Sequence, residues 1–349
     1  MEELMQKRIE QFNQFVMSQD IDKLPVGLFS GKMGLCIYFY HQSKFLRNKK
    51  LEKFADRLLE SLIKQLSTKS YINIEDGIAG ICLGLNYLIN KGIQTGNANY
   101  ILSELDDRIY QKAWFELLKN NSGSIEALQS ILQVALYFSI RLKNKDLSKD
   151  NRFTFESIVI KVINQIENAP NPSVIFSEPS MFSINQYFIC NYLYLLSNVY
   201  ALGFFNYKIT KILDEIYPKL ASTYPFLQTN RLQLLSVVEY LNTKIERDLY
   251  AQYAIRLRQD INMDYIINNE FKHRNLLLRD GLCGMYLFQN VLLKNTQLPE
   301  SLISHRIIYS DLWDNTYKEQ KISDSSIGLF TGISGIILIY MNLKGEIEL

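Results

Sequence analysis

Three side chains that lie near one another in the sequence could perform acid–base chemistry: His273, Arg279 and Asp280. A histidine or an aspartate can take a proton as a general base, and an arginine can stabilise negative charge on a reacting group. The arginine and the aspartate could instead bind a peptide or a small polar ligand. The simplest alternative is an ion pair between them that caps a helix.

Several further polar residues lie at or near the start of apolar segments and are candidates for ligand binding. We select Glu75, Asp76, Asn185, Arg231 and Ser326. Ser124, Glu126, Gln186 and Asn230 occupy similar positions. Each of them, taken singly, is typical of a helix cap or a solvated loop.

The residues that usually bind metals are scarce and scattered. The four cysteines are Cys36, Cys82, Cys190 and Cys283, each in an apolar stretch, and no CxxC or CxxH pair exists. This pattern predicts buried thiols in a reducing compartment. Of the three histidines, only His273 is near the candidate residues. We therefore predict no metal site.

The elements that must position these residues follow a repeated motif. GLFSGKMG begins at Gly27 and GLFTGISG begins at Gly328. Shorter copies, DGIAG and DGLCG, begin at Asp76 and Asp280. An apolar helical segment follows each copy, and recurrence of one unit along a chain indicates a repeat protein.

The helical segments alternate between two kinds. A helix that is apolar on every side is buried, whereas an amphipathic helix keeps one face in water. The predicted buried helices span residues 31–46, 77–90, 124–142, 181–202, 228–243, 281–294 and 332–343. The predicted outer helices are amphipathic over residues 2–19, 49–67, 99–119 and 151–168, rich in charge over 246–263, and mixed over 206–219 and 302–318.

The spacing of the motifs supplies the number of repeats. The gap from Gly77 to Gly281 is 204 residues, four times the 51 residues from Gly281 to Gly332. Three degenerate copies fit in this gap, beginning near Ser124, Met181 and Gln228. Seven buried and seven outer helices predict an all-α fold, an α/α toroid that forms a single domain over residues 1–349. An open solenoid is the alternative.

The two glycines of each GxxG motif predict close approach of another backbone. The preceding Ser30, Asp76, Asp280 and Thr331 are residue types that cap helices. If the buried helices run in one direction, their N-termini form a rim with free N–H groups, which favours anionic or carbonyl-bearing ligands.

Composition excludes several classes of protein. The chain of 349 residues is 47% hydrophobic and has a net charge of only +2, so we expect no nucleic-acid partner. The most apolar segment, residues 182–205, contains too many polar residues for a lipid-facing span. We expect a cytoplasmic protein without membrane insertion.

Four GxxG motifs in register resemble the lanthionine synthetase C-like family, which includes cyclases of lantibiotic biosynthesis. The resemblance implies a seven-fold α/α toroid. It also implies a peptide substrate, or a partner enzyme of peptide modification such as a dehydratase. Active members of the family bind zinc in a central cavity, through one cysteine of the fifth buried helix region and a Cys-His pair before the sixth GxxG.

This chain departs from that pattern at each metal ligand. Arg279 and Asp280 stand where the family has the Cys-His pair, and residues 226–236 contain neither Cys nor His. The first hypothesis is therefore a member without zinc that binds a peptide or small polar ligand in the cavity. The second is a metal-independent thioether cyclase, with Asp280 or His273 as base and Arg279 stabilising the enolate. The third is a carbohydrate-active α/α toroid that uses a pair of carboxylates. Whether the chain is an enzyme stays open.

Overall fold

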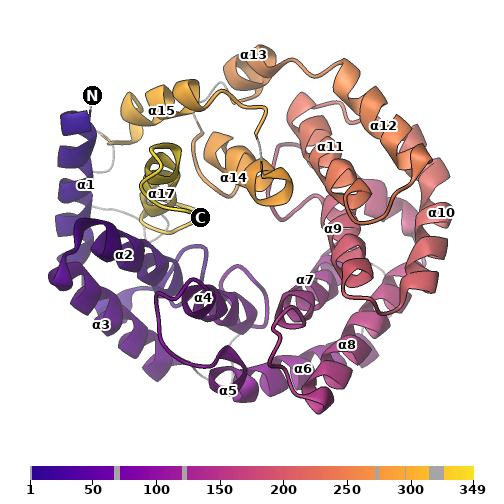
Figure 1. The fold of residues 1–349 in the computed structure, drawn as a ribbon, viewed down its shortest axis with the longest axis horizontal. Coiled ribbons are helices and arrows are strands. Elements are labelled where there is room, and N and C mark those ends of the chain that lie inside the picture. Colours follow the sequence, from indigo (N-terminus) through magenta and orange to yellow (C-terminus); the bar gives the residue numbers. More distant parts are fainter. Residues whose placement is uncertain (1, 67–70, 120–123, 272–274, 295, 314–325) are drawn as a thin grey trace. The chain divides into compact units, whose positions relative to one another are not determined.

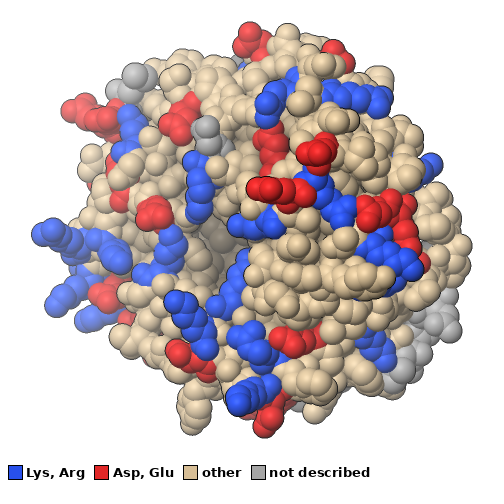
Figure 2. Space-filling model, turned by 45° about the vertical axis from the view of Figure 1, so that its right-hand side comes forward, with Lys and Arg blue, Asp and Glu red and all other residues tan. Residues whose placement is uncertain are grey.

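The structure is a computed structural model, and it describes residues 2–66, 71–119, 124–271, 275–294, 296–313 and 326–349. Every regular element in these ranges is a helix. None of the helices in the described ranges combines the length and the apolar character needed to cross a bilayer. Basic and acidic side chains are interspersed on the face shown in Figure 2, in keeping with the small net charge.

The chain forms two compact units. Unit 1 comprises residues 1–98, 273–287 and 298–349, and unit 2 comprises residues 99–272 and 288–297. Each unit is described by itself. The prediction of one domain over residues 1–349 stays a prediction.

Unit 1 contains the helices that follow the GxxG motifs. Its elements are α1 (Glu2–Met17), η1 (Ile21–Lys23), α2 (Lys32–Leu46), α3 (Lys49–Gln65), α4 (Ile78–Asn90), the first half of α14 (Leu282–Leu293), α15 (Glu300–Ile308) and α17 (Ile333–Leu343). Helix α2 packs against α3, α4 and α17 (Figure 1).

The predicted alternation of buried and amphipathic helices is confirmed in the first hairpin. All residues of α2 from Lys32 to Ser43 are buried. In α3 the buried positions form a single stripe that includes Leu51, Phe54, Leu58 and Leu62. The sequence patterns therefore locate both helices, and packing of the apolar stripe of α3 on α2 accounts for most of their stability.

Unit 2 repeats the same hairpin arrangement without GxxG motifs. Its elements are α6 (Ser103–Lys119), α7 (Ile125–Arg141), α8 (Lys149–Glu167), η2 (Pro172–Phe176), α9 (Phe188–Ala201), α10 (Asn206–Ser222), α11 (Gln228–Asn242), α12 (Asp248–Gln259), α13 (Met263–Tyr265) and η3 (Ile266–Glu270). The short α5 (Ala98–Ile101) lies at the boundary. Helix α9 packs against α7 and α11, and a buried ion pair of 2.7 Å between Arg141 and Asp106 joins α7 to α6.

Four predicted helices differ from the observed ones. The helix predicted over 246–263 is shorter, because α12 ends at Gln259 and Met263 begins α13. The helix predicted over 181–202 begins at Phe188, because the backbone before it has other partners: Gln233 Nε2 donates to the Ser183 carbonyl at 3.0 Å. The helix predicted over 99–119 is divided into α5 and α6. The helix predicted over 302–318 ends at Ile308, and residues 314–325 lie outside the described ranges.

Candidate functional site

The GxxG glycines of unit 1 lie directly against the backbone of the loops that precede them. A Cβ atom on Gly80, Gly284 or Gly335 would come within 3.0 Å of the carbonyl oxygen six residues earlier, closer than real Cβ atoms approach. The first glycines of the motifs, Gly31 and Gly77, show the same contact. The predicted close approach is confirmed, and its partner is the motif's own loop.

The prediction that polar side chains cap these helices is wrong. The N-cap residues of α2, α4 and α17 are Gly31, Gly77 and Gly332, and none makes a side-chain capping bond. Ser30, Asp76 and Thr331 therefore do not cap, and the Asp280 carboxylate accepts hydrogen bonds from Asn275 and Arg279 instead of from α14. The glycine motif brings the loop so close that a backbone acceptor takes the place of a side-chain cap.

The predicted rim of free N–H groups is also corrected. The Lys32 amide donates to the Pro25 carbonyl at 2.7 Å, and the Ile78 amide donates to the Tyr71 carbonyl at 2.7 Å. The Leu282 amide of α14 donates to the Asn275 carbonyl at 2.9 Å. Because the loop carbonyls already use these donors, the helix ends offer less to an anion than isolated N-termini would.

Backbone hydrogen bonds join the four motif loops of unit 1 in series. The Arg279 amide donates to the Phe330 carbonyl at 2.9 Å, and the Phe330 amide donates to the Phe29 carbonyl at 3.0 Å. The amides of Leu28 and Phe29 both donate to the Glu75 carbonyl at 2.9 Å. We call these loops, residues 27–31, 75–77, 279–281 and 328–332, the motif belt. Main-chain bonds of this kind hold the side chains of the belt in fixed relative positions.

Arg279 and Asp280 form the most accessible charged pair of the belt. Arg279 Nη2 lies 3.2 Å from Asp280 Oδ2, and their side chains are 43% and 15% exposed. Asn275 Nδ2 donates to Asp280 Oδ1 at 2.8 Å and to the Asp280 carbonyl at 3.2 Å. The carboxylate is thus held in place, while the guanidinium keeps surface for a carbonyl or carboxylate of a ligand.

Three other candidates lie on or beside the same belt. The Asp76 side chain is exposed, and its Oδ1 accepts a hydrogen bond of 2.7 Å from Ser30 Oγ. Glu75 supplies the carbonyl that accepts from the first motif. The Ser326 backbone lies against Gly332. The structure therefore brings together five of the eight candidates: Arg279, Asp280, Glu75, Asp76 and Ser326.

The other two described candidates, Arg231 and Asn185, belong to unit 2. Arg231 is 7% exposed, and its guanidinium donates to the carbonyls of Asp260 and Pro225 at 3.1 and 2.9 Å. Its Cζ lies 4.0 Å from the ring of Tyr224. The Asn185 carbonyl accepts hydrogen bonds from Asn191 and Gln129. Both residues therefore hold loops of unit 2 together. His273 lies outside the described residues.

Two carboxylates that the sequence analysis did not identify accept hydrogen bonds from the backbone amides at the start of α11. In unit 1 the carbonyls of the motif loops accept these bonds instead. Glu178 accepts from the amides of Phe226 and Leu227 at 2.8 and 2.9 Å. Glu270 accepts from the amides of Gln228 and Thr229 at 2.7 Å each. Carboxylates at a helix N-terminus interact favourably with its dipole. Because both glutamates are more than 40 residues away in the chain, no local pattern could have revealed them.

The described donors do not fit the zinc site that the resemblance implies. Arg279 is a cation without an acceptor atom, so it cannot be a ligand, and it already pairs with Asp280. All four cysteines are free and buried, and burial raises the pKa of Cys283 and Cys190, which disfavours the thiolate that zinc requires. Within the described ranges, no group of three or more His, Cys, Asp or Glu could hold a metal ion.

Comparison with known proteins accounts for the fold. Residues 22–173 match the family described as lanthionine synthetase C-like protein. The solved structure of nisin cyclase matches 99% of this chain and 95% of its own, with a TM-score of 0.65 and 15% sequence identity. No curated protein sequence matches the chain. At this identity the structural match shows the fold, so the predicted all-α class and α/α toroid are confirmed. Residues 22–173 thus match the lanthionine synthetase C-like family, and the chain as a whole has the fold of nisin cyclase.

Proposed function

We propose that this protein binds a peptide or a small polar ligand at the motif belt, without zinc, through Arg279 and Asp280. One observation carries the proposal: this exposed guanidinium and its fixed carboxylate occupy the positions immediately before the glycine of α14, where the family resemblance places metal ligands. An arginine can bind a carbonyl or carboxylate of a peptide, and an aspartate can accept from a peptide N–H.

The rigidity of the belt supports binding. Arg279 and Phe330 are joined through their main chains, and so are Phe330 and Phe29, so the pair does not have to be ordered when a ligand arrives. A preorganised site loses less conformational entropy on binding. The name of nisin cyclase supports a peptide as the class of ligand, because a cyclase of nisin acts on that molecule. We place the protein in the cytoplasm, where four free and buried cysteines would persist.

A peptide-binding measurement tests this proposal. A linear peptide that contains cysteine and dehydroamino acids is titrated into the full chain by calorimetry, with an oligosaccharide as the comparison ligand. We expect the peptide alone to bind, and Arg279→Ala to weaken binding about tenfold or more, as loss of a charge-assisted hydrogen bond does. The matched control is Arg57→Ala, which removes an exposed arginine from the outer face of α3.

Two further readouts separate the parts of the proposal. Metal analysis of the purified protein should give far less than one zinc per chain, and stoichiometric zinc would overturn the zinc-free assignment. Formation of a thioether by the metal-free protein, lost in Asp280→Asn, would instead favour the metal-independent cyclase, because the carboxylate would then serve as the base. Equal peptide affinity of Arg279→Ala and the unmodified chain would exclude the belt as the site.

A further inference from the structure

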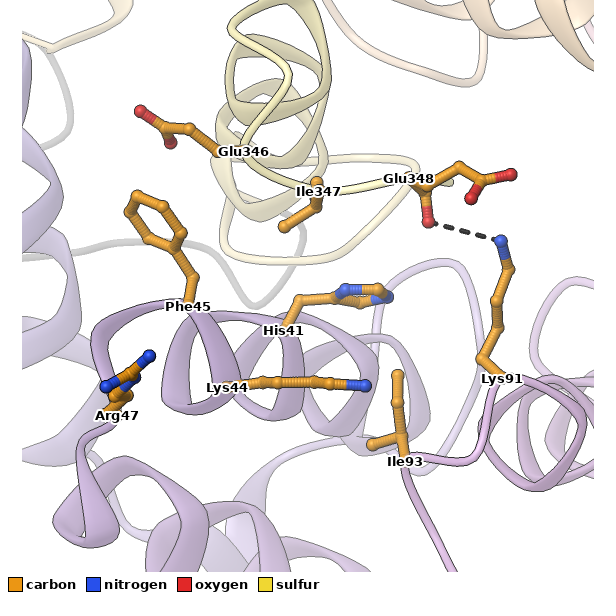
Figure 3. A pocket seen from close by; sticks show the side chains of 9 residues that line it. All are labelled: His41, Lys44, Phe45, Arg47, Lys91, Ile93, Glu346, Ile347 and Glu348. Atoms are coloured by element: carbon orange, nitrogen blue, oxygen red, sulfur yellow. Dashed lines mark hydrogen bonds between the residues drawn. The ribbon is translucent and has the colours of Figure 1, made fainter.

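A cavity of about 470 Å³ lies in unit 1 at the carboxyl-terminal ends of α2 and α4 (Figure 3). His41, Lys44 and Phe45 of α2 line it together with Lys91 and Ile93, which follow α4. Residues 346–348, beyond the end of α17, form another wall. The motif belt adjoins the amino-terminal ends of the same helices. The cavity is therefore distinct from the ligand site proposed above.

His41 forms a buried part of this cavity. The residue is 6% exposed, and its Nε2 lies 2.8 Å from the Tyr87 hydroxyl. Its Nδ1 has no hydrogen-bond partner among the residues that the structure describes. Burial, aided by Lys91 and Lys44, lowers the pKa of His41 to about 4. At neutral pH the ring is uncharged, and one of its nitrogens remains available to a ligand.

The basic residues that line the cavity outnumber its acidic residues: Lys44, Arg47 and Lys91 stand against Glu346 and Glu348. Lys91 Nζ donates to the backbone carbonyl of Glu348 at 3.2 Å rather than to the carboxylate (Figure 3). Glu346 and Glu348 both line the cavity, yet in the described part of the chain no carboxylate lies within 4.0 Å of the Lys44, Arg47 or Lys91 side-chain nitrogens. The cations therefore form no direct ion pair with these carboxylates and exceed them by one, and a concave surface with excess positive charge attracts anions.

The helix dipole accounts for only part of this arrangement. The carboxyl-terminal end of α2 attracts basic residues, which explains the presence of Lys44 and Arg47 in the sequence there. The dipole does not explain where the side chains of Lys44 and Lys91 point. Lys44 runs beneath His41 toward Ile93 (Figure 3), and Lys91 reaches the wall formed by residues 346–348. Both ammonium groups act on the same imidazole, so their fields converge inside the cavity.

We propose that this cavity binds a phosphate group, with Lys44 and Lys91 as its cationic partners and His41 as a neutral hydrogen-bonding partner. Lysine binds phosphate as a point charge, and a phosphate group offers two ammonium groups more acceptor oxygens than a carboxylate does. The volume exceeds that of phosphate alone, and Phe45 and Ile93 provide apolar wall for an organic substituent. A phosphate monoester of a small molecule therefore fits the cavity best.

Histidine NMR on the full chain tests the site directly. The chain has only three histidines, and the variants His41→Gln and His305→Gln assign two of the signals. Inorganic phosphate is titrated at constant ionic strength against chloride. We expect a saturable shift of the His41 signal and an increase in its pKa, because a bound anion stabilises the imidazolium. Phenyl phosphate should bind more tightly than inorganic phosphate, and equal affinity would assign the site to free phosphate.

Charge variants decide whether the cavity is responsible. Lys44→Gln and Lys91→Gln should each weaken phosphate binding about tenfold, the effect of losing one charged hydrogen bond. The control is Lys50→Gln, which removes an exposed lysine of α3 outside the cavity and should leave binding unchanged. The proposal is overturned if phosphate produces no saturable shift of His41. An unchanged affinity in the double variant Lys44→Gln/Lys91→Gln, with normal circular dichroism, would overturn it equally.

Discussion

Phe29 and Phe330 occupy the same position in the first and last copies of the glycine motif, and they are joined twice. The Phe330 amide donates to the Phe29 carbonyl at 3.0 Å, and the two rings stack with their centroids 4.1 Å apart and their planes 13° from parallel. The two ends of the sequence therefore meet within unit 1 through one main-chain bond and one aromatic contact. The stability of the belt depends on how closely its glycines allow these loops to approach.

Gly335→Ala tests this dependence. The added Cβ would collide with the Leu329 carbonyl and would lie 2.8 Å from Leu278 Cδ1. Because a backbone carbonyl cannot move aside as a side chain can, we expect a loss of about 1–3 kcal/mol in the free energy of unfolding, measured with urea. Ser334→Ala is the control, since this buried hydroxyl has no partner in the described part of the chain. Equal stability of the two variants would show that the close approach is unimportant.

Replacing Glu270 tests the carboxylates that hold the start of α11. Glu270→Gln removes the charge but keeps one acceptor for the amides of Gln228 and Thr229. We expect a loss of about 1 kcal/mol in the free energy of unfolding, and a similar loss for Glu178→Gln, because charge-assisted bonds to a helix N-terminus are weakened. Glu246→Gln, at an exposed position before α12, serves as the control. The role assigned to both glutamates fails if all three variants unfold at the same urea concentration.

Lys32 should make stability rise at alkaline pH. Its side chain is buried and donates to Ser61 Oγ at 2.9 Å and to Gln65 Oε1 at 2.7 Å. Burial lowers the pKa of Lys32 from its ordinary 10.5, although Asp22 opposes the change. The unfolded chain then holds this proton more tightly, so stability increases as pH rises from the lowered pKa toward 10.5.

Lys32→Met should remove that increase. At neutral pH we expect the variant to be at least as stable as the unmodified chain, because it buries no charge. The difference should shrink as the pH rises through 10.5, because above that pH Lys32 is mostly neutral in both the folded and the unfolded chain. Urea unfolding at neutral and alkaline pH measures both effects. A loss at neutral pH of about 2 kcal/mol or more, as in a core truncation, would contradict this account of Lys32.

His41 should make the protein less stable in acid. Burial and the nearby Lys91 and Lys44 lower the pKa of His41 from 6.5 to about 4. The stability that the neutral His41 contributes is complete above pH 6.5. It is lost as the pH falls from 6.5 to about 4, because the unfolded chain binds the proton at a higher pH than the folded chain does. The loss amounts to about 3 kcal/mol over this interval. His41→Gln should flatten the unfolding free energy between these two pH values.

The exposed His305 provides the control for that experiment. His305→Gln removes an exposed histidine instead, and its unfolding is measured over the same pH range. If His41→Gln and His305→Gln give the same slope, the imidazole of His41 is not the group that titrates. Lys91→Gln should raise the pKa of His41, since it removes one of the two cations that act on the ring.

The sequence predicted the fold well where glycine spacing and apolar patterns are local properties. Helices α2, α3, α4 and α17 begin and end within about two residues of their predicted bounds. The start of α9 could not be predicted, because Gln233 of α11 holds the preceding segment out of the helix. The helix caps were predicted wrongly for a similar reason. At Gly31 and Gly77 a backbone carbonyl of the folded loop, not a neighbouring side chain, accepts from the start of the helix.

For the candidate site, residue types alone determined which charges stand before Gly281, the positions where the family resemblance implies metal ligands. Only the tertiary structure decided how they are used. It fixed Asp280 through Asn275, left Arg279 partly exposed, and placed Lys91 beside His41 across a gap of 50 positions. The physical reason is that burial and electrostatic fields depend on distances in space, which a sequence pattern specifies only within one helix or loop.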